Sequence, residues 1–86
     1  MGKLHLTKKE AQILDLLERN AGEPVSKKLL LEHVWGYREG VRTRTLDVHI
    51  SRLRNKLAHR PGVRILTVTG LGYLMEAARL PELPAA

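Results

Sequence analysis

The chain has no cysteine and no phenylalanine, and its aromatic side chains are one Trp and two Tyr among 86 residues. The absence of cysteine excludes disulfide bridges, thiolate zinc sites and cysteine nucleophiles, and it fits a reducing compartment, so we expect a cytoplasmic protein. So few aromatic side chains provide little surface on which single-stranded bases could stack. No apolar run approaches the roughly 20 residues that span a bilayer, and the N-terminus shows no signal-peptide pattern.

Patterns that support catalysis are also missing. No glycine-rich phosphate loop precedes a predicted helix, and no Ser, His and acidic residue have the spacing of a catalytic triad. The four histidines lie apart, without the spacing of a zinc motif: His5, His33, His49 and His59. We therefore expect neither an enzyme nor a bound metal or cofactor. His33 is expected to be half-buried, because it lies beside the apolar stripe of its helix. Trp35 is expected to lie in the core.

The positive charge is concentrated in one part of the chain. The formal net charge is +6, and residues 42–64 carry seven basic side chains against the single acid Asp47. This distribution predicts a polyanionic partner. The alternative is a solvated basic helix that only keeps the chain soluble. The seven basic residues are Arg42, Arg44, Arg52, Arg54, Lys56, Arg60 and Arg64.

The N-terminal half contains two helices with recognisable starts. Thr7 and Glu10 form a capping box, which predicts a helix over about residues 8–21. Ser26 is a candidate N-cap for a second helix, because the Glu-Pro-Val stretch before it disfavours helix. Gly36 is expected to end that second helix.

A third helix is expected over about residues 44–58, with Thr43 as its N-cap and Asp47 in its first turn complementing the helix dipole. Its apolar residues follow at spacings of 4, 3 and 4 and form one inward-facing stripe of Leu46, Ile50, Leu53 and Leu57. About 120° away lies a mixed cationic and polar face of Thr45, Val48, His49, Arg52 and Lys56, flanked by Arg44, Ser51 and Asn55. These are the groups that the major groove requires, because Arg binds guanine, Asn pairs with adenine and Val contacts the thymine methyl.

The remaining segments predict strands and a tail. Lys3–Leu6 alternates polar and apolar residues and is expected to form a short strand. Residues 63–69 are rich in β-branched side chains, and a Gly-Leu-Gly turn joins them to a partner strand over 73–76. With the three helices, this predicts an α+β winged helix-turn-helix with a C-terminal hairpin wing. We expect that domain to occupy residues 1–79 and a flexible tail to follow at 80–86.

Two runs of the sequence are highly specific. Residues 44–57 read RTLDVHISRLRNKL, and residues 67–73 read TVTGLGY. Together with Leu6-Thr7-x-x-Glu10 and Leu30-Leu31-x-x-Val34-Trp35-Gly36, they closely resemble the effector domain of response regulators of the OmpR/PhoB family. The resemblance covers about residues 4–76. It implies a truncated N-terminal sheet, because family domains normally begin with a four-stranded sheet and only one strand's worth of residues precedes the first helix here. It implies a bacterial transcription factor of a two-component system that binds double-stranded DNA.

The resemblance implies that the third helix enters the major groove and that the wing, residues 69–73, lies near the minor groove. It assigns the base and phosphate contacts of the helix to Arg44, Thr45, Val48, His49, Ser51, Arg52 and Arg54. On the hairpin it assigns phosphate contacts to Thr67 and Tyr73. Thr69, also expected at the DNA, stands where family members often have an arginine that inserts into the minor groove. We therefore expect specificity to depend more on the helix than on the wing.

Further partners are implied by the resemblance alone. The loop Tyr37–Arg42 lies where such proteins can touch RNA polymerase, with Tyr37, Arg38 and Glu39 as the expected contacts. In family members an upstream receiver domain controls dimerisation, and two effector domains bind tandem half-sites head to tail. We expect this chain to be a fragment that begins at an added Met-Gly, the alternative being a natural stand-alone domain.

The residues themselves raise two other functions, of which only the first stays open. A winged-helix interaction module would use the same basic face to bind an acidic protein. Binding to an anionic membrane surface would need apolar residues on an exposed amphipathic helix, whereas the third helix uses its apolar face for the core, so no membrane partner is expected. A gel shift with random duplex separates DNA binding from protein binding, because the interaction module should give no shift at low salt.

Overall fold

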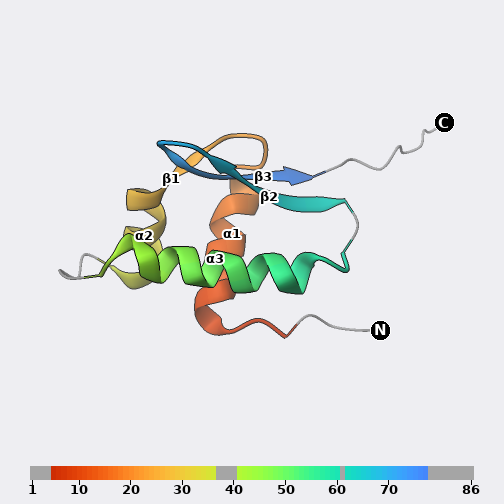
Figure 1. The fold of residues 1–86 in the computed structure, drawn as a ribbon, viewed down its shortest axis with the longest axis horizontal. Coiled ribbons are helices and arrows are strands. Elements are labelled where there is room, and N and C mark those ends of the chain that lie inside the picture. The colour runs from red at the N-terminus through yellow and green to blue at the C-terminus, as the bar shows by residue number, and fades with distance from the viewer. Residues whose placement is uncertain (1–4, 37–40, 61, 78–86) are drawn as a thin grey trace.

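The computed structural model describes residues 5–36, 41–60 and 62–77, and in these residues three helices pack against a three-stranded antiparallel sheet (Figure 1). The helices are α1 (Lys8–Arg19), α2 (Lys27–Trp35) and α3 (Thr43–Leu57). The strands are β1 (Val25–Ser26), β2 (Val63–Val68) and β3 (Gly72–Ala77), in the sheet order β1-β3-β2. The predicted winged helix-turn-helix, with three helices followed by a hairpin, is confirmed.

The starts of α1 and α2 follow from short-range hydrogen bonds. The Glu10 amide donates to Thr7 Oγ1 at 3.1 Å, and the Thr7 amide donates to Glu10 Oε1 at 3.0 Å, so the predicted capping box is confirmed. At α2, Ser26 Oγ accepts from the Leu29 amide at 3.0 Å, as expected of an N-cap. α1 ends two residues earlier than predicted, at Arg19, where the side chain of Asn20 donates to a carbonyl of the last turn.

α3 begins differently from the prediction. Its N-cap is Arg42, with no side-chain cap bond, and Thr43 is the first helical residue rather than the cap. Asp47 lies beyond the first turn, so the expected interaction with the helix dipole is wrong. The carboxylate instead accepts a hydrogen bond from Tyr73 on the hairpin. The apolar stripe of α3 is confirmed, because Leu46, Ile50, Leu53 and Leu57 are all buried.

The sheet contains one strand that the sequence did not predict, β1. Val25 pairs with Tyr73 and Ser26 with Gly72, so β1 closes the sheet beside β3. A Cβ on Gly72 would lie 2.0 Å from the carbonyl oxygen of Val25, so this position requires glycine. Of the strand expected at Lys3–Leu6, the last two residues are not in a strand, and the first two lie outside the described residues.

The core lies between the helices and the inner face of the hairpin. Ile13, Leu17, Leu30 and Val34 from α1 and α2 meet the α3 stripe, and the sheet adds Val25, Ile65, Tyr73 and Met75. Trp35 is partly buried against this cluster, in line with the prediction that it belongs to the core. His33 is exposed, so the expectation that it would be half-buried is wrong.

One ion pair connects the start of α1 to the end of α3. Glu10 is 1% exposed, and its Oε1 lies 2.6 Å from Lys56 Nζ, which also donates to the His5 carbonyl at 2.9 Å. Burial opposes ionisation of this carboxyl. The hydrogen bonds from Lys56 and from the Thr7 amide, with the charge of Lys56, outweigh that effect and lower the pKa of Glu10.

We expect Lys56→Met to lower the free energy of unfolding by about 2–3 kcal/mol at neutral pH, because the buried carboxylate loses its charged partner. A carboxyl with a lowered pKa stabilises the fold above its unfolded pKa, and that contribution is lost as the pH falls through the folded pKa. The cost of the substitution should therefore shrink in acid. Urea denaturation at neutral pH and at a pH below the ordinary glutamate pKa measures both effects.

Arg64→Met is the matched control, because it breaks the exposed Arg64–Glu76 pair, whose side chains are 69% and 48% exposed. It should cost less than about 1 kcal/mol. Equal losses for the two variants would contradict the structural role given to Lys56.

Candidate nucleic-acid interface

The most exposed side of α3 lies directly opposite its buried stripe. We call it the outer stripe: Arg44, Val48, Ser51, Arg52 and Asn55, which fall within about 100° of helical arc. Four of these side chains are exposed polar or cationic groups, and the fifth, Val48, is 39% exposed. The exposed face of α3 is therefore rotated relative to the predicted one. Arg44, Ser51 and Asn55, which were expected to flank that face, lie within the outer stripe.

One margin of the outer stripe turns toward α2. The His49 ring meets Trp35 edge-on, with 5.0 Å between centroids, and Lys9 Nζ lies 5.4 Å from the centroid of the same Trp. His49 Nδ1 lies 2.8 Å from the Thr45 carbonyl, which can only accept, so Nδ1 carries a proton. The neutral ring then has only the Nε2 lone pair left. His49 and Thr45 are half-buried here rather than fully presented to solvent.

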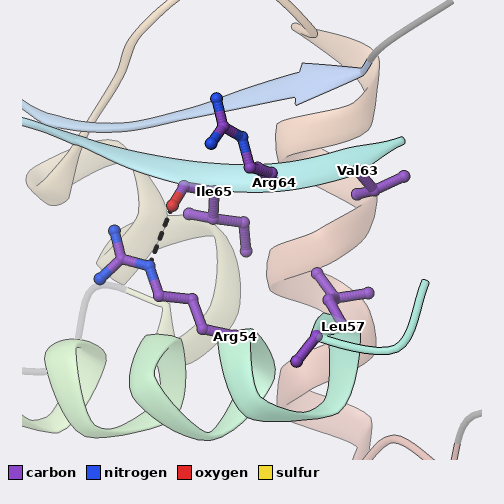
Figure 2. A pocket seen from close by; sticks show the side chains of 6 residues that line it. Arg54, Leu57, Val63, Arg64 and Ile65 are labelled. Carbon is purple, nitrogen blue, oxygen red and sulfur yellow. Dashed lines mark hydrogen bonds between the residues drawn. The ribbon is translucent and has the colours of Figure 1, made fainter. Parts of the chain in front are cut away.

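The other margin of the outer stripe turns toward the hairpin. Arg54 donates from Nε to the Ile65 carbonyl at 2.9 Å, as Figure 2 shows, and from Nη2 to Thr67 Oγ1 at 2.8 Å. Its guanidinium carbon also lies 5.5 Å from the centroid of the Tyr73 ring. Two of the five N–H donors of Arg54 are therefore used within the protein.

Tyr73 connects β3 to α3 through its hydroxyl. The residue is 5% exposed, and the hydroxyl donates to Asp47 Oδ1 at 2.6 Å. Lys27 Nζ lies 3.4 Å from the same carboxylate oxygen. Burial first, and then the hydrogen bond to Asp47 and its charge, raise the pKa of Tyr73 to about 12, with a smaller opposing effect from Arg54. The only donor of this hydroxyl is thus already engaged in the hydrogen bond to Asp47.

The turn between β2 and β3 is the exposed end of the hairpin. Of the wing predicted at 69–73, Thr69, Gly70 and Leu71 form this turn, and Leu71 is 46% exposed. Gly70 has a φ of +83°, a conformation that favours glycine. Gly72 and Tyr73 are instead buried in β3. The Lys27 amide donates to the Leu71 carbonyl at 3.1 Å, which fixes the turn beside the start of α2.

The structure gathers most, but not all, of the predicted site. Among the predicted site residues, those that the structure leaves exposed on α3 and the hairpin are Arg44, Val48, Ser51, Arg52, Thr67 and Thr69. The predicted contacts Tyr37, Arg38 and Glu39 lie outside the described residues, as does the tail. Sequence reasoning missed the link from Lys27 and Asp47 to the hairpin. The position of Asp47, alone among seven bases, was the available signal that this acid has an internal partner.

The described part of the chain also bears on metal, membrane and small-molecule binding. No group of three His, Asp or Glu side chains is placed there to hold a metal ion. None of the described helices combines the length and apolar character needed to cross a membrane. The hollow in Figure 2, between the end of α3 and β2, measures about 220 Å³, and a larger one of about 600 Å³ is lined by residues that include Leu66, Leu74 and Glu76.

Comparison with known proteins agrees with this geometry. The sequence model of the family described as "Transcriptional regulatory protein, C terminal" matches residues 2–75. The probable transcriptional regulator ycf27 of Galdieria sulphuraria is 47% identical over 78 residues, which are 86% of this chain and 31% of that protein. The chain thus spans about a third of the length of the curated relatives it matches.

Two solved structures are similar over most of the chain. The OmpR/PhoB homolog DrrB of Thermotoga maritima is 38% identical with a TM-score of 0.69, over 85% of this chain and 34% of that one. The RstA DNA-binding domain of Klebsiella pneumoniae, solved in complex with the RstA box, is 34% identical with a TM-score of 0.71. That match covers 88% of this chain and 76% of the RstA domain.

We expect Tyr73 to ionise near pH 12, which tyrosinate absorbance measures in a Tyr37→Phe background where Tyr73 is the only tyrosine. Because the folded pKa lies above the ordinary value of 10.0, the stabilising effect is complete below about pH 10 and is lost as the pH rises toward 12. Asp47→Ala should lower the pKa of Tyr73 while leaving the effect of burial. Ionisation near pH 10 in the folded domain would show that the phenol is not held as described.

Proposed function

Because this chain belongs to the family of C-terminal DNA-binding domains of OmpR/PhoB response regulators, we propose that α3 lies in the major groove with its outer stripe toward the bases. The family is one of transcriptional regulators that bind DNA, not of enzymes. Membership therefore decides between the two functions that the basic face left open, in favour of duplex DNA. The single observation that carries the proposed orientation is the exposure of the outer stripe opposite the core.

Within the outer stripe, each side chain has a chemical role that the groove can use. Arg52 can donate two hydrogen bonds to guanine, and the methyl groups of Val48 can contact the thymine methyl. Arg44 and Ser51 lie beside them and can reach bases or phosphates. At the margin, Thr45 and His49 are proposed to contact the backbone. In its neutral form His49 would do so only as an acceptor, because Nδ1 already donates to the Thr45 carbonyl.

On the hairpin, the geometry favours some of the expected phosphate contacts over others. Thr67 accepts from Arg54, so its own hydroxyl proton is free to reach a phosphate, and Arg54 has N–H donors left. The Tyr73 hydroxyl donates its proton in a hydrogen bond to Asp47, so a phosphate contact from that hydroxyl would require the bond to Asp47 to break. We propose that Thr69 and the turn lie near the minor groove. A threonine lacks the long cationic reach of arginine, so this wing would add little minor-groove specificity.

The whole protein would extend beyond this domain. Since the chain covers about a third of its relatives, we propose an upstream receiver domain and head-to-tail binding of two domains on tandem half-sites. The RNA polymerase contact is proposed at Tyr37, Arg38 and Glu39. These proposals rest on the family and not on the described residues.

We expect Arg52→Ala to weaken binding to a duplex selected from a random pool by about 1–3 kcal/mol, with less effect on unselected duplex, so that sequence preference relaxes. Fluorescence anisotropy with both duplexes at one salt concentration measures this. The loss should be specific to the selected site, because a phosphate contact would weaken both duplexes alike.

Arg19→Ala is the matched control. It also removes one exposed arginine, but on α1, where the side chain is 72% exposed and pairs with Asp15. It should change both affinities alike and slightly. If Arg52→Ala behaved as Arg19→Ala does, α3 would not read bases through its outer stripe.

A further inference from the structure

We infer that Asp47, Tyr73 and Arg54 are positioning residues that orient the wing relative to α3, and through it the contacts that the wing makes with DNA. We call these three residues and their bonds the wing brace. The inference rests on the proposed function and deepens it. It gives the three side chains a role other than direct contact with the nucleic acid.

The wing brace joins α3 to both strands of the hairpin. Asp47 and Arg54 lie two turns apart on the hairpin side of α3. The first accepts from the Tyr73 hydroxyl on β3, and the second donates to Ile65 and Thr67 on β2. The Arg54 guanidinium also lies over the Tyr73 ring, so the two connections share a contact. The hairpin is thus bonded to α3 at two separate points along the helix.

Two such points control orientation in a way that the core does not. Apolar burial holds β2 and β3 on the helices, but it is non-directional, and a two-stranded hairpin is barely stable alone. Hydrogen bonds weaken steeply when their angles change. With bonds at Asp47 and at Arg54, a rocking or sliding of the hairpin along α3 would break at least one of them. The wing brace therefore fixes the spacing between the two DNA-facing elements.

The charges of Asp47 and Arg54 favour a role within the protein over direct contact with DNA. Asp47 is the one acid among seven bases in residues 42–64, and a free carboxylate there would repel phosphates. Its oxygen is instead occupied by the Tyr73 hydroxyl and by Lys27 at 3.4 Å. Arg54 gives two donors to the hairpin that would otherwise be available to phosphates.

The opposite side of the wing is held by backbone contacts. β1 pairs with β3 at Tyr73 and Gly72, and the Lys27 amide donates to the Leu71 carbonyl. The base of the wing is therefore held from α2 on one side and from α3 on the other. A wing fixed in this way before binding does not have to be ordered by the DNA, which preserves affinity.

The experiment compares Tyr73→Phe and Asp47→Ala with Asp47→Asn, whose amide oxygen can still accept from Tyr73. The duplex is the one selected by the unchanged domain. We expect the first two variants to bind about 3–10-fold more weakly, with the salt slope nearly unchanged, because the hydroxyls of Thr67 and Thr69 carry no charge to neutralise phosphates. Hydroxyl-radical protection should disappear only at the backbone facing the wing, and base preference under α3 should not change. Asp47→Asn should restore most of the protection.

A merely structural role would produce a different result. Ile13→Val, in the core on α1, serves as a control that lowers stability without removing any hydrogen bond of the wing brace. It should weaken protection everywhere or nowhere, and not at the backbone facing the wing alone. If Tyr73→Phe and Asp47→Ala matched that pattern, or if Asp47→Asn were no better than Asp47→Ala, the wing brace would be wrong.

A measurement without DNA separates this failure from failure of the proposed function. In the free domain, Asp47→Ala should speed amide hydrogen exchange in β2 and β3 more than in α1, and equal acceleration throughout would overturn the wing brace. If the unchanged domain shifted no duplex at low salt, the proposed function would be overturned, and the role of the wing brace at DNA with it.

Discussion

A straight helix beside a small core has one rotation that buries Leu46, Ile50, Leu53 and Leu57 together, and α3 adopts it. Burying four such side chains contributes about 6–12 kcal/mol by area. No arrangement of the exposed polar groups of α3 offers a comparable gain. The core therefore decides which side chains face outward, and the outer stripe is the geometric consequence. The packing of the core therefore determines which surface of α3 is proposed to contact DNA.

The basic segment serves two purposes that charge alone does not separate. Three of its seven cations have partners within the protein: Arg54 on the hairpin, Lys56 on Glu10 and Arg64 on Glu76. The exposed Arg44 and Arg52 lie on the outer stripe instead. A net charge of +6 therefore overstates the charge that the domain presents to phosphates. With so small a core, an 86-residue chain gains from polar connections between elements, and arginine and lysine supply them here.

The sequence predicts those features that arise from neighbouring residues. The Thr7 capping box, the Ser26 cap and the 4-3-4 spacing of the α3 stripe all act within one or two turns or along one helix face, and the structure confirms them. What it does not predict depends on long-range pairing. Asp47 meets Tyr73 across 26 positions and Glu10 meets Lys56 across 46, and no local pattern marks such partners.

The same limit explains the rotated face of α3. From the helix alone, the two margins of the apolar stripe are equivalent, so the sequence does not show which neighbouring element covers Thr45 and His49 on one side or Arg54 on the other. The structure breaks that equivalence, because Trp35 of α2 approaches one margin and the hairpin approaches the other. The surface available to DNA is what these two neighbours leave uncovered. The side opposite the core follows from periodicity, but the limits of the exposed surface on either side depend on where α2 and the wing pack.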